Sequence, residues 1–140
     1  MSGIVVVAEN GSGRYQQAIT VGQHQLIADE PESLGGNDAG PAPFDLLMAG
    51  LGACTSITLR MYAERKALNL TQVSVALSHE KIELDGVKRD RIQRTITLTG
   101  DMNSEQCQRL LEIANKCPVH RAVSPSLLIE TTLAEPAITP

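Results

Sequence analysis

Two cysteines stand in segments of very different character, and cysteine is a side chain well suited to redox chemistry. Cys54 ends an apolar run, Leu46-Leu-Met-Ala-Gly-Leu-Gly-Ala-Cys54, in which no side chain is charged. Cys117 stands where a helix is predicted to break, in Cys117-Pro118-Val119-His120. We therefore expect a buried thiol at Cys54 and a thiol at a structural break at Cys117. Together they indicate thiol redox chemistry.

The third cysteine, Cys107, shares one apolar helical stripe with Cys117. On an intact helix, a rise of ~1.5 Å per residue places these two thiols roughly 15 Å apart. A disulfide needs Cα atoms within about 7 Å. Any intramolecular disulfide is therefore expected to involve Cys54. Cys107 lies among leucines, where a free cysteine commonly acts as a small core hydrophobe.

A reactive Cys54 needs a nearby positive charge, because desolvation alone raises the pKa of a thiol and makes it inert. Cys54 is expected about three turns into its helix, too far from the N-terminus for the helix dipole to help. Arg60 points to another face of that helix, and Arg65 lies about three turns away. We expect the cation to come from outside this helix.

The elements around the cysteines predict an α+β fold. A three-stranded β-meander is expected over residues 4–28, and a connection rich in Gly and Pro follows. A long helix from Pro43 to about Ala67 carries Cys54, and its first part is apolar all round, as in a helix buried on every side. Loops as long as the connection before this helix are often functional.

Alternating apolar residues predict two strands, around residues 73–78 and 92–99, with a hairpin turn at Asp85-Gly86. A second helix, capped by Asn103 or Ser104, is expected to end at Cys117 because Pro118 disfavours helical geometry there. A last strand is predicted over residues 127–133. Four basic residues near the hairpin are interpreted as a solvated strand end rather than an anion site: Lys88, Arg89, Arg91 and Arg94.

Composition favours a single domain over residues 1–140 and argues against several classes of partner. A net charge of −4, with two Tyr, one Phe and no Trp, argues against nucleic-acid binding. No basic segment precedes the first apolar run, and no uncharged apolar stretch approaches the ~20 residues of a membrane span. We expect a soluble cytoplasmic protein without a membrane partner, whose thiols are reactive or buried rather than joined in structural disulfides.

A metal site is the alternative use of the same residues. Cys117 and His120, together with Cys54, would supply three soft ligands for zinc. A fourth ligand and a second ligand pair are missing from the sequence. We therefore expect no metal, and interpret His120 as a polar neighbour of the Cys117 thiol.

Two segments of the chain resemble a known family. Pro41-Ala-Pro43-Phe-Asp-Leu-Leu-Met-Ala-Gly-Leu-Gly-Ala-Cys54-Thr resembles the first-cysteine signature of the OsmC/Ohr proteins, the osmotically inducible and organic hydroperoxide resistance proteins. Lys116-Cys117-Pro118-Val119-His120-Arg121 is similar to their second signature. The segment Leu34-Gly-Gly36 and the order of elements also fit, so the resemblance covers nearly the whole chain. It implies an intertwined homodimer in which each long helix packs at the interface.

The resemblance also implies an activity, a thiol peroxidase of the stress response that reduces organic hydroperoxides. Cys54 would attack the peroxide and become a sulfenic acid, and Cys117 would resolve it as a disulfide. An external dithiol such as a lipoyl group, free or carried on a protein, would reduce that disulfide. No metal, flavin or other bound cofactor is implied.

The family's activating arginine is matched here by Arg14, which would hold Cys54 as a thiolate. The hydroperoxide-resistance branch pairs this arginine with a glutamate ten residues before its first cysteine. Phe44 occupies that position here, and the carboxylate is next door at Asp45. Asp45 would meet Arg14 only if the helix began irregularly. This departure points to the broader OsmC-like branch of the family.

Two other functions compete with the peroxidase. A non-catalytic dimeric binding protein would hold a small apolar ligand at Cys54, and Phe44 favours this reading slightly. An acyl-transfer enzyme would use Cys54 as its nucleophile but lacks an obvious base, since His120 stands beside the other cysteine. The retained cysteine pair and Arg14 favour the peroxidase.

Overall fold

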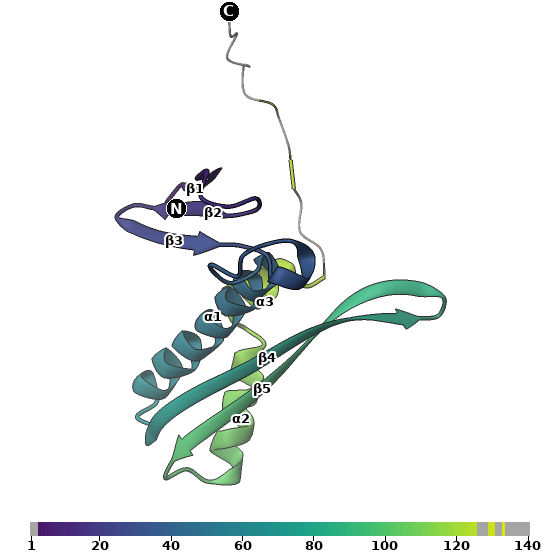
Figure 1. The fold of residues 1–140 in the computed structure, drawn as a ribbon. Helices are drawn as coiled ribbons and strands as arrows, with labels where there is room; N and C mark the ends of the chain where they lie inside the picture. The colour runs from purple at the N-terminus through teal and green to yellow at the C-terminus, as the bar shows by residue number, and fades with distance from the viewer. Residues whose placement is uncertain (1–2, 126–128, 131–132, 134–140) are drawn as a thin grey trace, which may run out of the picture.

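The structure, a computed structural model, describes residues 3–125, 129–130 and 133. It has the predicted α+β class, with a three-stranded and a two-stranded antiparallel sheet (Figure 1). The elements, in chain order, are β1 (Val5–Glu9), β2 (Gln17–Val21), β3 (His24–Ala28), the short 3-10 helix η1 (Glu32–Leu34), α1 (Pro43–Arg65), β4 (Leu70–Leu84), β5 (Val87–Gly100), α2 (Ser104–Ala114) and α3 (Pro118–Val123).

Strands β1, β2 and β3 form the antiparallel meander that the sequence predicted. Val5 of β1 pairs with Val21 of β2, which in turn pairs with His24 of β3. Gly22 turns the chain between β2 and β3 at a φ of 58°, which glycine adopts at little cost. The three valines of β1 stay more than half exposed, so the sheet leaves apolar surface uncovered in the single chain.

The connection between β3 and α1 is organised by Asp29, whose side chain is almost fully buried. Its carboxylate accepts the backbone N–H groups of Glu30 at 2.8 Å and of Asn37 and Ala39 at 3.1 Å. Burial disfavours the charged carboxylate, but the three N–H groups outweigh it and lower the pKa of Asp29. This long segment is thus held in one shape just before α1.

Helix α1 begins at Pro43 as predicted and ends at Arg65, close to the predicted end at Ala67. Proline suits the first helical position, because its missing N–H would be unpaired there. One side of α1 packs against β4, α2 and α3. The buried residues of that side are Leu51, Gly52, Thr55, Leu59 and Ala63.

The other side of α1 is apolar yet exposed in the single chain, so the all-round burial expected of its first part is not met there. Ile57 and Met61 are large apolar side chains on this side, and Phe44 and Leu47, near the start of α1 beside the hairpin, are also exposed. By length and mean hydropathy alone, α1 could also cross a membrane, but a single helix with these properties is weak evidence for a membrane span. The same features fit a helix that another protein surface covers.

Strands β4 and β5 form the predicted hairpin, but they are far longer than the alternating pattern indicated. Asp85 and Gly86 turn the chain with φ values of 51° and 76°, the positive values of a tight hairpin turn. Beyond the apolar stretch, charges are paired across the strands, as between Glu80 and Arg91. Apolar alternation cannot reveal such a stretch. The resulting arm reaches beyond the helices (Figure 1).

Helix α2 ends earlier than predicted, at Ala114, so Cys117 is not its last residue. Pro118 instead starts a new helix, α3, which the sequence reading missed, and Cys117 caps it. Proline is as well suited to begin a helix as to end one, which explains the error. The last strand predicted over residues 127–133 falls mainly outside the described residues.

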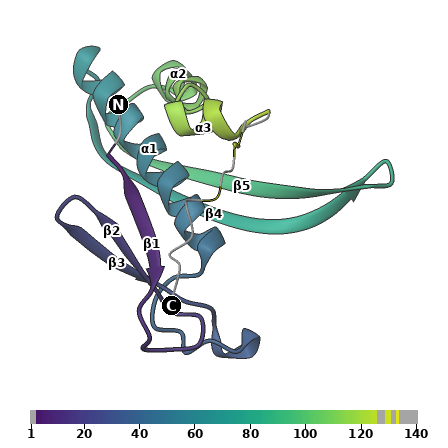
Figure 2. The same cartoon turned by 90° about the horizontal axis from the view of Figure 1, so that it is seen from above.

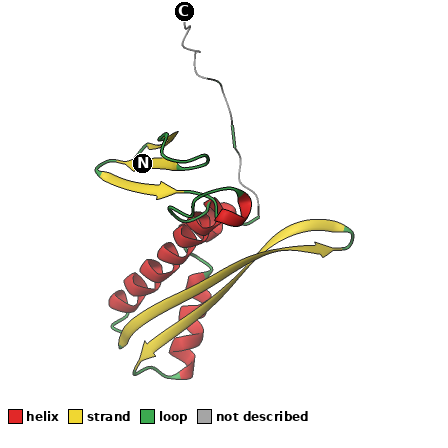
Figure 3. Cartoon of the chain, viewed as in Figure 1, coloured by secondary structure: helices red, strands yellow, loops and turns green. Residues whose placement is uncertain are grey.

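The main apolar cluster joins α1 to α2, and α2 lies on the opposite side of α1 from β1–β3 (Figures 2 and 3). Leu59 of α1 and Leu110 of α2 are both fully buried within it. Inward-facing residues of β4 and β5, such as Val73 and Ile96, pack against this cluster. It fixes α1, α2 and the hairpin relative to one another, and so positions the two cysteines.

Candidate functional site

Helix α1 carries two adjacent residues of the site, Cys54 and Thr55. Thr55 lies on the buried side, and its hydroxyl donates to the carbonyl of Leu51 at 2.7 Å. Cys54 is half-buried, with its sulfur 4.0 Å from the hydroxyl of Thr58. Cys54 was expected to be fully buried, and in the single chain it keeps some exposure.

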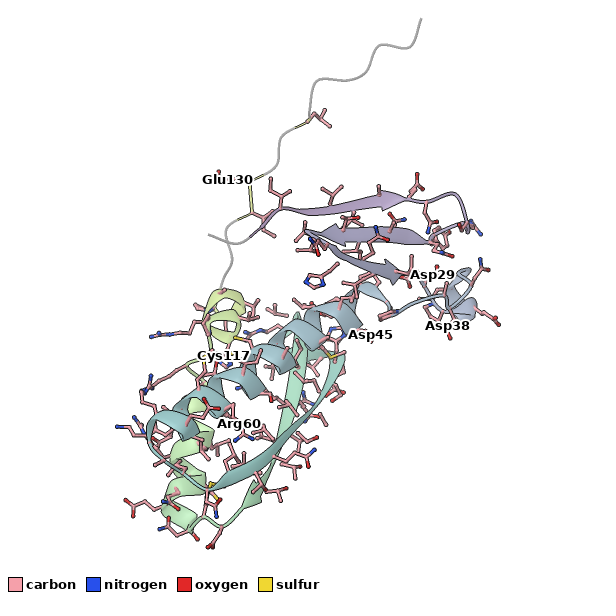
Figure 4. All side chains as sticks on the ribbon, turned by 90° about the vertical axis from the view of Figure 1, so that its left-hand side faces the viewer. Asp29, Asp38, Asp45, Arg60, Cys117 and Glu130 are labelled. Carbon is pink, nitrogen blue, oxygen red and sulfur yellow. The ribbon has the colours of Figure 1, made fainter. Side chains whose placement is uncertain are left out.

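Cys117 is the more buried thiol, with 0% of its surface exposed. It lies where α3 begins, beside α1 (Figure 4). Its backbone is extended, and Sγ accepts the backbone N–H of His120 at 3.3 Å. Cys117 thus lies at the break expected of it, between α2 and α3, with its side chain buried as the cap of α3.

The two cysteines meet although they belong to different helices. Sγ of Cys117 lies 3.9 Å from the hydroxyl of Thr55, the residue next to Cys54, and the Cys54 thiol is near enough to lower the pKa of Cys117. Both cysteines are free thiols in this structure. The third cysteine, Cys107, lines a separate hollow of about 420 Å³ with Ile96, Leu98 and other residues. The structure therefore groups Cys54 with Cys117 and leaves Cys107 apart.

The surroundings of Cys117 favour its thiolate. Burial raises the pKa of this thiol, but hydrogen bonds from His120, Cys54 and Thr55 and the charge of Arg94 together lower it below its ordinary value. Among these groups, the backbone N–H of His120 lowers it most. A thiolate is the form in which a thiol attacks another sulfur.

Arg94 is the cation at this site, although it was predicted to lie at a solvated strand end. Its guanidinium donates to the hydroxyl of Thr55 and to the side-chain oxygen of Asn115, each at 2.9 Å. One signal in the sequence marks it. Arg94 occupies the inward-facing register of β5, where Ile92 and Ile96 flank it at two-residue spacing.

The other two candidate charges lie elsewhere in the single chain. Arg14, in the connection between β1 and β2, holds its guanidinium 4.8 Å from the centre of the Tyr15 ring. Asp45 accepts the backbone N–H of Ala42 at 3.0 Å and so caps α1. Since α1 begins regularly at Pro43, the irregular start needed to pair Asp45 with Arg14 is absent.

His120 lies next to Cys117 through its backbone, while its ring faces a cleft. Burial, and then the nearby charge of Arg94, lower the pKa of its imidazole. Both effects favour a neutral ring at pH 7. In the described part of the chain, no three His, Cys, Asp or Glu side chains are grouped so that they could hold a metal ion.

The cleft has a volume of about 750 Å³ and is apolar with a few charged groups. Phe44 lines one part of it and stacks on His79, with ring centres 3.8 Å apart. His79 in turn bonds to Asp90 at 2.8 Å. The lining residues are Phe44, Leu47, Leu51, Arg89, Asp90, Ile92, Arg94, Ile96, Leu111, Asn115, Val119, His120, Val123, Ser124 and Pro125.

Comparison with known proteins places this chain in a family. A model of the OsmC-like proteins matches residues 35–132. The fold is similar to that of an OsmC-like protein from Mycoplasma pneumoniae, at 17% identity and a TM-score of 0.75, over 89% of each chain. An organic hydroperoxide resistance protein OsmC from Legionella pneumophila shares 22% identity at a TM-score of 0.69, over 91% of this chain and 92% of that one.

OhrB, the organic hydroperoxide resistance protein of Bacillus subtilis, is 21% identical at a TM-score of 0.63, over 91% of this chain and 93% of that one. No curated protein matches the sequence. At such identities the solved structures show the common fold alone. Because the family model spans well over half of the sequence, the chain belongs to the OsmC-like protein family.

Proposed function

We propose that the protein is a thiol-dependent peroxidase that reduces organic hydroperoxides. The observation that carries the proposal is that Cys117, at the start of α3, lies against the segment of α1 that carries Cys54: Sγ of Cys117 is 3.9 Å from the hydroxyl of Thr55, the residue after Cys54, and the Cys54 thiol is among the groups that lower the pKa of Cys117. In the proposed cycle the Cys54 thiolate attacks the distal peroxide oxygen, the O–O bond breaks, and an alcohol leaves. The Cys117 thiolate then attacks the sulfenic sulfur, the S–O bond breaks, and hydroxide leaves as water after protonation.

The exposure of the two sulfurs supports this division of roles. Cys54 is half-buried, so a hydroperoxide can reach it, whereas Cys117 is fully covered. Cys117 needs to reach only Cys54. Its environment favours the thiolate, which is the form that the second step needs.

The roles of the supporting residues remain predictions. Arg14 is predicted to hold Cys54 as a thiolate, although in the single chain it contacts Tyr15. Asp45 is predicted to support Arg14, and its bond to Ala42 is the competing interaction. The ring of His120 is predicted to serve as a polar neighbour of the resolving thiol.

We propose further that the protein works as an intertwined homodimer. The exposed apolar side of α1 and the exposed valines of β1 are surfaces that water disfavours and a second copy would cover. The proposed cycle uses no metal or flavin, and a cytoplasmic dithiol of the lipoyl type, free or carried on a protein, would reduce the Cys54–Cys117 disulfide. Reduction by dihydrolipoamide but not by glutathione would support that choice.

The test is a free-thiol titration of the reduced protein after one equivalent of cumene hydroperoxide without air. Wild type should lose two thiols rapidly. Cys54→Ser should be inert, and Cys117→Ser should stop at a sulfenic acid that dimedone traps. Cys107→Ser is the matched control and should behave as wild type. If the wild-type thiols react only as slowly as free cysteine, the proposal is wrong.

A non-catalytic dimeric binding protein is the second candidate, and the cleft favours it. Its volume of about 750 Å³ and its apolar walls would suit a small apolar ligand. Phe44, which occupies the position of the glutamate in the hydroperoxide-resistance branch, is one of the residues that line the cleft. Slow thiols in the titration, together with saturable binding of an apolar fluorescent probe that Phe44→Ala weakens, would favour this function.

A further inference from the structure

Arg94 is unusual among the basic residues of β5 because it faces inward. Its side chain is half-buried and takes a position in the apolar register of the strand. Its guanidinium is held at two points, the hydroxyl of Thr55 and the side-chain oxygen of Asn115. Among the described residues, no ion pair includes Arg94. Its charge is therefore not neutralised by a carboxylate.

The group that this charge faces is Cys117. Thr55 bridges the two, since its oxygen accepts from Arg94 at 2.9 Å and lies 3.9 Å from Sγ of Cys117. The other titratable groups near this sulfur are Cys54 and His120. Burial, and then the charge of Arg94, disfavour the protonated ring of His120, so the ring adds no second positive charge. Arg89 and Asp90 line the neighbouring cleft and carry opposite charges. Arg94 is thus the cation that acts on the Cys117 sulfur.

We propose that Arg94 is the positioning residue of the resolving step: its charge, anchored on the hydroxyl of Thr55, favours the thiolate of Cys117 beside Cys54. This inference rests on the proposed peroxidase cycle. The Cys117 thiolate attacks the sulfur of the Cys54 sulfenic acid, the S–S bond forms, and the S–O bond breaks. The hydroperoxide has already supplied the oxidation, and the departing hydroxide takes up a proton to become water. Arg94 acts on Cys117, so it leaves the first oxidation of Cys54 untouched.

The first experiment examines Cys117 without any peroxide. In a Cys54→Ser, Cys107→Ala background Cys117 is the only cysteine, and its ionisation is followed by thiolate absorbance near 240 nm. Arg94→Gln should raise the titration midpoint of Cys117. Arg94→Lys keeps a positive charge and should restore most of the shift. Arg91→Gln is the matched control, since Arg91 is an exposed cation of the same strand that pairs with Glu80.

The second experiment measures the two chemical steps separately in a Cys107→Ala background. Stopped-flow mixing with cumene hydroperoxide should show the same rate of Cys54 oxidation with and without Arg94→Gln. Disulfide closure at pH 7 should slow in proportion to the thiolate fraction that Cys117 loses, because the thiolate is the form that attacks the sulfenic sulfur. Dimedone should therefore trap more sulfenic acid on Cys54. Circular dichroism confirms that each variant is folded.

The outcomes distinguish this inference from the proposed function. An unchanged Cys117 midpoint in folded Arg94→Gln, or an unchanged rate of disulfide closure, overturns the role of Arg94. If Cys54 fails to react with hydroperoxide in every variant, the peroxidase proposal and the resolving role fall together. The thiolate titration then still decides whether Arg94 controls the ionisation of Cys117.

Discussion

The hydroxyl of Thr55 lies 3.9 Å from the sulfur of Cys117, although 62 positions separate the two residues in the sequence. The same oxygen donates to the carbonyl of Leu51 and accepts from Arg94. A hydroxyl has one proton and two lone pairs. While the Thr55 hydroxyl donates its proton to the Leu51 carbonyl, its oxygen can accept hydrogen bonds from Arg94 and from the S–H of Cys117. To stabilise the thiolate, that proton has to turn from Leu51 towards the sulfur.

Replacing Thr55 by valine should therefore change both the chemistry and the stability of the protein. Thr55→Val keeps the shape but removes the contact to Cys117 and one anchor of Arg94, so the pKa of Cys117 should rise. The same change leaves an N–H of Arg94 without its acceptor, so the free energy of unfolding should fall by about 1–3 kcal/mol. Thiolate absorbance and urea unfolding measure the two effects. Thr55→Ser keeps the hydroxyl, and equal thiolate titrations of the two variants would contradict the prediction.

The parts of the fold with a periodic signal could be predicted from the sequence. The meander, the helix from Pro43 and the turn at Asp85-Gly86 all appear where expected. The arm of β4 and β5 was predicted too short, because its outer half is stabilised by cross-strand charges such as those of Glu80 and Arg91. A pattern of apolar residues contains no trace of such pairs.

The site was harder to predict, because its geometry comes from tertiary contacts. Arg94 was overlooked because arginine usually lies on the protein surface. Its position in the strand instead places it on the inward-facing side of β5. The relative burial of Cys54 and Cys117 was reversed, because Pro118 was read as ending a helix and not as starting α3. The apolar run before Cys54 was taken for full burial, whereas some of its side chains, such as Leu47, are exposed in the single chain.

Asp29 should stabilise the loop before α1 in a pH-dependent manner. Its pKa is lowered in the folded protein, so its contribution is fully present above the unfolded value near 3.8 and is lost as the pH falls through the folded value. At pH 7, Asp29→Asn should therefore unfold at a lower urea concentration than wild type. The difference should shrink once the pH drops below 3.8.

The control for this loop is Asp38→Asn, because Asp38 is an exposed carboxylate of the same segment. Urea midpoints of wild type and both variants, measured from pH 7 to pH 3, make the comparison. Asp38→Asn should follow wild type throughout. A gap between wild type and Asp29→Asn that stays constant with pH would show that the carboxylate charge of Asp29 is not what holds the loop.

The exposed side of α1 should be the surface that joins two copies. Ile57 is 53% exposed in the single chain, and a charge there would be buried without a partner in a dimer. Ile57→Asp should raise the dimer dissociation constant at least tenfold, which weakens the free energy of dimerisation by about 1.4 kcal/mol or more. Light scattering after size-exclusion chromatography gives the masses. Gln108→Asp places the same charge on an exposed position of α2 and should leave the mass unchanged. A monomeric wild type would refute the dimer.

Cys107 should be dispensable for the redox chemistry, because its hollow is separate from the meeting point of the other two thiols. It faces apolar residues such as Leu98 and Met102, and it is not among the groups that shift the pKa of Cys117. Cys107→Ala should therefore still lose two thiols to one equivalent of cumene hydroperoxide, at the wild-type rate. Removing one half-buried sulfur should lower the free energy of unfolding by about 1 kcal/mol. Mass spectrometry of the oxidised variant should find a single disulfide, between Cys54 and Cys117. A variant that instead stops at a sulfenic acid would make Cys107 the resolving thiol.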